Sequence, residues 1–160
     1  MIAGGALASR LLVAIPGIVL AVVVVAVGGV LFAATMAVIA ALALYELYSL
    51  TAAARPLRWA GYLGTLLTIL GAWWSDDGER GMLVGLGAGL AFVAVAGLIL
   101  ARRDEITARM AMTLLGVVYV GVPFGILVIM RELPNGAAAI VNVLVGVWVF
   151  DTASYFGGRM

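Results

Sequence analysis

The longest uncharged stretch of this chain runs from Leu11 to Tyr45 and is almost entirely apolar. A single helix over these residues would be about 52 Å long at about 1.5 Å per residue, whereas the hydrocarbon core of a bilayer is roughly 30 Å thick. The stretch also far exceeds the roughly 7–15 apolar residues of a secretory signal peptide. We therefore expect it to fold back on itself in a membrane, with the corner at Gly28-Gly29, because paired glycines favour turns.

Two arrangements of this stretch remain open. Helices over residues 11–27 and 30–48 would each cross the membrane near the short end of the spanning range. A shallow re-entrant hairpin is the alternative.

The composition extends the membrane prediction to the whole chain. Hydrophobic residues make up 66% of the 160 residues and charged residues 11%, against roughly 45–50% and roughly 25% in soluble globular proteins. We expect an all-α fold, a polytopic transmembrane bundle of about six helices in a single domain over residues 1–160. Beyond the first two helices, the apolar runs predict helices at about 59–74, 81–101, 110–130 and 137–155.

The residue types present limit the chemistry of the chain. All nine basic residues are arginine, histidine and cysteine are absent, and the net charge is +1. Nucleic-acid binding is therefore not expected, because there is no broad basic face. Zinc, thiol and imidazole chemistry are excluded as well. Any metal would be bound by oxygen ligands, as magnesium is.

The arginines test the helix map, because positive charges gather on the cytoplasmic side of a membrane protein. Seven of them fall on one side of the map and two on the other. The majority side carries Arg10, Arg55, Arg58, Arg102, Arg103, Arg109 and Arg159, and the minority side carries Arg80 and Arg131. This distribution predicts a cytoplasmic N-terminus. A composition rich in alanine, glycine, valine and arginine is typical of high-GC bacteria, so we expect the inner (cell) membrane of a bacterium.

Two glycine-containing segments indicate special helix packing. Gly81, Gly85 and Gly89 share one helix face and let a neighbouring backbone approach closely. Packing within the same subunit is favoured over a dimer interface. In the following helix, Pro123 lies between Gly121 and Gly125, so we expect a bend there that could open a cavity.

Two carboxylates are attached to apolar helices, Glu46 and Asp151. Glu46 is interpreted as an interfacial charge that pairs with Arg10 or Arg55. Asp151 begins a more distinctive segment, because Asp151, Ser154 and Tyr155 would lie on one face of a continuing helix.

The residues after this face extend the candidate site. Gly157 and Gly158 free the backbone to approach a ligand. The guanidinium of Arg159 is suited to binding phosphate. This pattern is compatible with magnesium-dependent chemistry at a membrane surface, although such residues also occur at ordinary helix ends.

The order of residues from Trp148 to Arg159 resembles the first motif of the phosphatidate cytidylyltransferase (CDP-diacylglycerol synthase) family. In that motif an aspartate is followed by a serine or threonine, small residues, a tyrosine, and a glycine before a basic residue. Gly28-Gly29 with Phe32, and the segment from Tyr45 to Tyr48, are similar to the family's opening. Ser154 departs from the alanine that is common before the tyrosine.

The resemblance implies transfer of a cytidylyl group from CTP to phosphatidic acid, with release of pyrophosphate, formation of CDP-diacylglycerol for phospholipid biosynthesis and a requirement for Mg²⁺. It implies that Asp151 is a catalytic or metal-binding carboxylate. It also implies that Ser154, Tyr155, Gly157, Gly158 and Arg159 bind the nucleotide or substrate. A homodimer is plausible from the same resemblance and from the glycine face.

The family's further motifs, rich in lysine and histidine, have no counterpart in this chain. We therefore expect an N-terminal portion of such an enzyme, truncated before the C-terminal catalytic half and inactive alone. The alternatives are a transporter or channel-like membrane protein, a structural membrane partner, or a CTP-dependent lipid-alcohol kinase of the same superfamily.

Overall fold

The computed structural model describes residues 16–100 and 106–158, and these residues are helical apart from short connections. The helices are, in chain order, Pro16–Val27, α2 (Gly29–Leu50), α3 (Arg58–Trp74), α4 (Gly78–Leu100), α5 (Ile106–Gly116), α6 (Val122–Glu132) and α7 (Gly136–Gly157). A 3₁₀ turn, η1 (Ala52–Ala54), follows α2, and a π-helical turn, η2 (Val117–Gly121), joins α5 to α6. No strand occurs in the described ranges, and the all-α prediction is confirmed.

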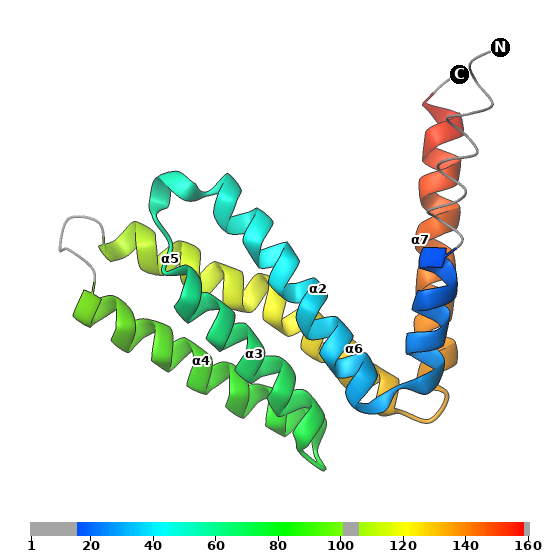
Figure 1. Cartoon of the computed structure of the whole chain (residues 1–160), viewed down its shortest axis with the longest axis horizontal. Coiled ribbons are helices and arrows are strands. Elements are labelled where there is room, and N and C mark those ends of the chain that lie inside the picture. Colours follow the sequence, from blue (N-terminus) through cyan, green and yellow to red (C-terminus); the bar gives the residue numbers. More distant parts are fainter. Residues whose placement is uncertain (1–15, 101–105, 159–160) are drawn as a thin grey trace.

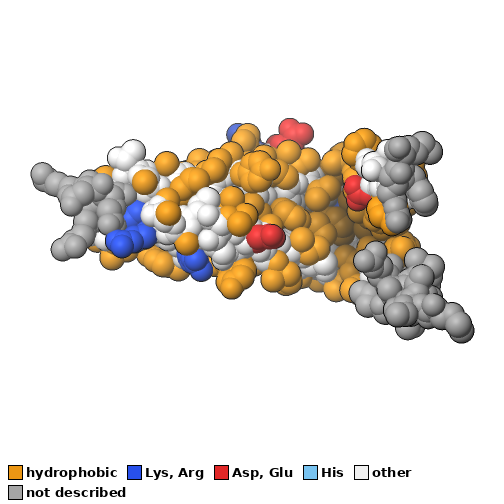
Figure 2. Space-filling model, turned by 90° about the horizontal axis from the view of Figure 1, so that it is seen from above, with side chains coloured by type: hydrophobic (Ala, Val, Ile, Leu, Met, Phe, Trp, Pro, Cys, Tyr) orange, Lys and Arg blue, Asp and Glu red, His pale blue; other side chains and the backbone are white. Residues whose placement is uncertain are grey.

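The helices form a bundle and a projecting arm (Figure 1). The bundle consists of α2 to α6, and the arm consists of the helix Pro16–Val27 together with α7. Four helices are long and apolar enough to cross a membrane: α2, α4, the continuous Ile106–Glu132 and α7. Hydrophobic side chains cover most of the face shown in Figure 2. Such an apolar surface is suited to contact with lipid rather than with water.

The core of the bundle lies where α2, α3 and α6 meet. Phe32, Leu44 and Tyr48 of α2 pack there with Ile69 of α3 and Val128 of α6, and each is at most 2% exposed. This core holds the bundle helices together, whereas most of the α7 surface lies outside it.

The corner expected at Gly28-Gly29 is present and connects the arm to the bundle. Both residues have positive φ, 68° for Gly28 and 54° for Gly29, which glycine adopts without a steric penalty. Residues 11–15, the first part of the expected helix 11–27, lie outside the described residues. After the corner, α2 runs for 22 residues.

The glycine face of α4 packs against α3 of the same chain. A Cβ atom on Gly89 would lie 2.7 Å from the Cα of Gly64, and one on Gly85 would lie 3.2 Å from the Cα of Thr68. A Cβ on Gly81 would collide with the carbonyl oxygen of Gly71. The two backbones therefore touch along this face. Its glycines are occupied within the subunit and are not available as a dimer contact.

The first turn of α4 begins earlier than the sequence predicted. The expected helix began at residue 81 after an acidic loop, but the structure begins α4 at Gly78. The cause is a cap that the apolar pattern does not reveal: the carboxylate of Asp77 accepts a hydrogen bond of 3.0 Å from the backbone N–H of Arg80. Aspartate is among the preferred residues at this position, because it satisfies an otherwise unpaired N–H of the first turn.

A π-helical turn, η2, lies directly before α6 and next to Pro123, where the sequence predicted a bend. Proline cannot donate a backbone hydrogen bond, and its ring conflicts with the carbonyl four residues earlier. A π-helical turn changes the hydrogen-bonding register at this point. Val117, Val120 and Gly121 of this turn are buried, so it is closely packed in the bundle.

The charged residues of the bundle are separated between its two ends. Arg55, Arg58 and Arg109 lie at the end where α2 and α4 finish. Arg80 and Arg131 lie at the opposite end, near the α3–α4 turn and the end of α6. The orientation in the membrane that the sequence predicts depends on this unequal distribution of arginines between the two ends. Arg10, Arg102, Arg103 and Arg159 lie outside the described residues.

Candidate functional site

The candidate site is on the last two turns of α7, far along the arm from the bundle (Figure 1). The helix is continuous from Gly136 to Gly157, so Asp151, Ser154 and Tyr155 share one face at spacings of three and four residues. All three side chains are exposed. The structure therefore aligns a carboxylate, a hydroxyl and a phenol along one accessible surface.

The neighbouring Thr152 is engaged differently. Its hydroxyl donates a 2.7 Å hydrogen bond to the carbonyl oxygen of Trp148, one turn earlier in α7. This back-bonding is common for threonine in apolar helices. It leaves the hydroxyl proton committed to the helix itself.

The two glycines end the helix. Gly157 is its last residue, and the N–H of Gly158 donates a 3.0 Å hydrogen bond to the carbonyl oxygen of Ser154. Among the described residues outside its own helix turn, no heavy atom lies within 4 Å of the place a Cβ of Gly157 would occupy, so a ligand could approach the backbone there. Arg159, the expected phosphate-binding residue, lies outside the described residues.

The described part of the chain supplies one carboxylate at this end of α7. No group of three or more aspartate, glutamate, histidine or cysteine side chains gathers within the described ranges. A magnesium ion commonly uses only one or two protein carboxylates and completes its coordination with water and substrate phosphates. Asp151 therefore fits as one ligand of such an ion, but it does not form a complete protein site.

The arm separates these residues from the bundle. α7 contacts α6 near the turn where it begins, and it then diverges from the bundle (Figure 1). The surface formed by Asp151, Ser154 and Tyr155 consequently has no bundle helix opposite it. Groups that would enclose a substrate here have to come from outside the described bundle.

A second polar cluster, which the sequence reasoning missed, lies at the arginine-rich end of the bundle. Tyr48 donates a 3.1 Å hydrogen bond from its hydroxyl to the carbonyl oxygen of Thr113. The hydroxyl of Thr113 accepts a 2.8 Å hydrogen bond from the backbone N–H of Leu57 and donates one of 2.7 Å to the carbonyl oxygen of Arg109. These bonds join α2, the start of α3 and α5 at this end of the bundle.

Two glycines make room for this cluster. A Cβ on Gly61 or on Gly116 would collide with the ring or hydroxyl of Tyr48, which lies between them and is fully buried. In the sequence, the cluster is visible only as a tyrosine at the end of one apolar helix and a glycine in each of two later helices. Sequence alone does not reveal that these three residues meet.

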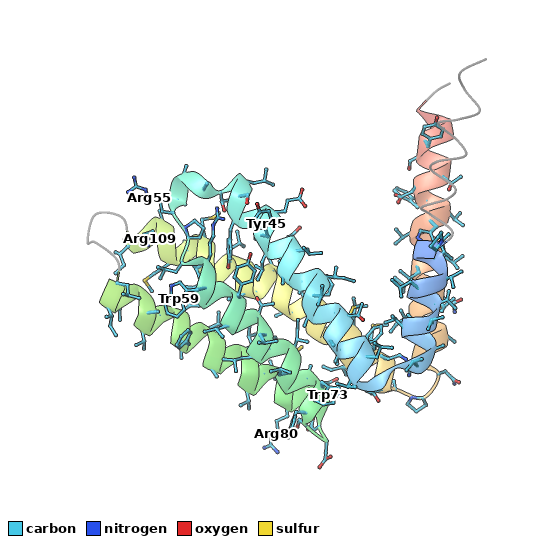
Figure 3. The ribbon with its side chains drawn as sticks, viewed as in Figure 1. Tyr45, Arg55, Trp59, Trp73, Arg80 and Arg109 are labelled. Atoms are coloured by element: carbon cyan, nitrogen blue, oxygen red, sulfur yellow. The ribbon has the colours of Figure 1, made fainter. Side chains whose placement is uncertain are left out.

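The arginines around the cluster are oriented by backbone carbonyl groups. Arg58 donates from Nη2 to the carbonyl oxygen of Tyr48 at 3.2 Å, and Arg109 donates from Nε to that of Arg55 at 2.9 Å. Figure 3 shows Arg55 and Arg109 at this end of the bundle, with Trp59 and Tyr45 nearby. This end therefore combines positive charge with interfacial aromatic residues. Glu46 is exposed on the same part of α2.

Comparison with known proteins decides the family. A model described as the cytidylyltransferase family matches residues 8–160, nearly the whole chain. The chain belongs to this family. No curated protein and no solved structure gives a match.

Membership of the cytidylyltransferase family confirms the resemblance found in the sequence. It places the chain among nucleotidyltransferases that use CTP, and it favours an enzyme over a transporter or a structural partner. The four long apolar helices agree with an integral membrane member of the family.

Proposed function

We propose that this chain takes part in the transfer of a cytidylyl group from CTP to phosphatidic acid in phospholipid biosynthesis. The observation that carries the proposal is the face formed by Asp151, Ser154 and Tyr155 at the far end of an apolar helix, in a chain of the cytidylyltransferase family. A site at the end of such a helix lies where a water-soluble nucleotide and a membrane-embedded lipid can meet.

The proposed reaction exchanges one phosphoanhydride bond for another. A phosphate oxygen of phosphatidic acid attacks the α-phosphorus of CTP, a new P–O bond forms, and the bond to the β-phosphate oxygen breaks. The products are CDP-diacylglycerol and pyrophosphate, which carries away the electron pair of the broken bond. Enzymes accelerate such transfers mainly by positioning the groups and by stabilising the negative charge on the phosphate oxygens.

In this reaction the described residues bind and orient the reactants. Asp151 is proposed as a catalytic carboxylate and as one ligand of Mg²⁺, which would neutralise phosphate charge when bound. The hydroxyl groups of Ser154 and Tyr155 are proposed to donate hydrogen bonds to the nucleotide or the lipid phosphate. Gly157 and Gly158 would let phosphate groups approach the backbone, and Arg159 would pair with them.

The distribution of the arginines supports a cytoplasmic site. The arginine-rich end of the bundle is proposed to face the cytoplasm of a bacterial cell, in accordance with the positive-inside rule. Because α7 begins at the opposite end of the bundle, crossing the membrane once brings Asp151 to that same cytoplasmic side. CTP is available there.

An isotope experiment distinguishes this function from that of a CTP-dependent lipid-alcohol kinase. Protein from the complete gene is incubated with phosphatidic acid or a lipid alcohol and with CTP labelled with ³²P at the α- or the γ-phosphate. The proposal predicts that only the α-label enters the lipid, together with release of pyrophosphate. Transfer of the γ-label to lipid would identify a kinase and overturn the proposal.

A further inference from the structure

A groove with a volume of about 640 Å³ runs along the surface between α3 and α4. Its apolar part is formed by Leu67, Leu70 and Val84, with Ala88 towards its inner end. It is open to the surface between two apolar helices. It belongs to neither the α7 face nor the Tyr48 cluster.

The floor of the groove is formed by glycines at the contact between the two helices. Gly71, Gly81 and Gly85 all line it, and these are the positions where the two helix backbones come into contact. A side chain at any of them would collide with the backbone of the opposite helix. The same glycines that hold α3 and α4 together therefore leave an open apolar channel beside the contact.

One end of the groove is lined by polar and aromatic residues. Arg80 and Ser75 line it there, beside Trp73 and Trp74. Figure 3 shows Trp73 and Arg80 at the α3–α4 turn. The two indole rings meet edge to face with their centroids 5.7 Å apart, and Trp74 is 80% exposed. Tryptophan prefers the level of lipid headgroups, so this end lies at a membrane–water interface.

The Arg80 side chain is available to an anionic group. Its backbone N–H is taken by the Asp77 carboxylate, but its guanidinium has no hydrogen bond or ion pair to any residue that the structure describes. A guanidinium at a membrane interface binds phosphate through paired hydrogen bonds. An apolar channel that ends in such a group matches a phospholipid, whose acyl chain adjoins a phosphate.

The charges around Arg80 select among phospholipids. The α3–α4 turn also carries Asp76, Asp77 and Glu79, so the turn is negative overall. A lipid with a net negative charge would be repelled by these carboxylates. A zwitterionic headgroup is complementary, because its phosphate can pair with Arg80 while its ammonium faces the carboxylates.

We infer that the α3–α4 groove is a binding site for a zwitterionic phospholipid, with an acyl chain along the glycine floor and the phosphate on Arg80. This site is separate from the proposed CTP reaction, because it lies on the bundle between α3 and α4, whereas Asp151 lies at the far end of the arm. The bound lipid would be a structural or regulatory ligand rather than the substrate.

Native mass spectrometry of the purified full-length protein tests this inference without measuring enzyme activity. The probes are phosphatidylethanolamine and phosphatidylglycerol with identical acyl chains, each added to delipidated protein. The inference predicts that phosphatidylethanolamine binds more tightly. Arg80→Gln should weaken its binding by about tenfold, since a charged hydrogen bond is lost.

Two further variants separate a defined groove from general lipid contact. Val84→Trp places a large side chain in the groove, whereas Leu83→Trp places it on the neighbouring, 62% exposed position of α4 outside the groove. Loss of phosphatidylethanolamine binding is expected for Val84→Trp only. Equal effects of the two tryptophans, unchanged binding in Arg80→Gln, or tighter binding of phosphatidylglycerol would each overturn the inference.

Discussion

Arg131, at the end of α6, donates a hydrogen bond from its guanidinium Nε to the carbonyl oxygen of Val25, 106 positions earlier in the chain. Its Nη2 donates a second bond of 2.9 Å to the carbonyl oxygen of Ala26. The last carbonyl groups of a helix lack partners within that helix, and a cation there also interacts favourably with the helix dipole. Arg131 therefore closes the end of the helix Pro16–Val27 and attaches it to the bundle.

Substitution of Arg131 by Gln should loosen this attachment. Hydrogen bonds to a charged group contribute about 1.5–3 kcal/mol, so the free energy of unfolding should fall by about that amount. Amide hydrogen exchange around Val27 and Gly28 should become faster in the purified protein. Glu132→Gln is the control, because it removes the neighbouring exposed charge at the end of α6 without breaking a side-chain bond within the described residues. Unchanged exchange in Arg131→Gln would contradict the capping role.

Gly89→Ala should destabilise the α3–α4 contact. The added methyl group would lie 2.7 Å from the Cα of Gly64, and backbone atoms cannot move aside as a flexible side chain can. Overpacking of this kind costs about 1–3 kcal/mol. The effect can be measured as a loss of unfolding free energy in detergent micelles.

Gly87→Ala provides the matched control for the contact at Gly89. It lies in the same helix, two residues away, and no heavy atom lies within 4 Å of its Cβ position. Replacing glycine by alanine in a helix favours folding by roughly 0.5–1 kcal/mol. The two variants should therefore change stability in opposite directions, and equal changes would show that the close packing is unimportant.

Thr113→Val tests the cluster beneath the arginine-rich end. The substitution keeps the side-chain shape but leaves the buried N–H of Leu57 without an acceptor, which costs about 1–3 kcal/mol. Thr35→Val is the control, since the Thr35 hydroxyl bonds only within its own helix, to Leu31. The expected result is a lower unfolding temperature for Thr113→Val and a change within about 0.5 kcal/mol for Thr35→Val.

Much of the fold could be predicted from local sequence patterns. The apolar runs predicted the helices, because a helix that crosses a membrane needs an apolar stretch long enough to span the hydrocarbon core. The Gly28-Gly29 corner was predictable because the uncharged stretch is too long to cross the membrane once. The chain must therefore turn back within it, and paired glycines favour such a turn. Pro123 predicted a departure from regular α-helix at this point, although the sequence did not reveal that it would be a π-helical turn.

Features that depend on distant contacts could not be predicted in the same way. Its sequence position indicates only that Arg131 is a charge outside the membrane, whereas in the structure it caps a helix more than a hundred residues away. Tyr48 likewise lies between Gly61 and Gly116, and no local pattern connects these residues. For the candidate site, helix periodicity predicted the shared face of Asp151 and Tyr155. It did not predict that α7 would carry this face away from the bundle.

Asp151 is proposed to act in CTP-dependent transfer to phosphatidic acid. The most direct measurement is the rate at which α-³²P-labelled CTP forms labelled CDP-diacylglycerol in the protein from the complete gene, compared with its Asp151→Asn variant. Glu132→Gln is the control, because it makes the same carboxylate-to-amide change at the end of α6, next to the start of α7 and far from Asp151. We expect Asp151→Asn to lose about a hundredfold or more of the rate, with Glu132→Gln close to the unmodified protein. Full activity of a folded Asp151→Asn variant would contradict it.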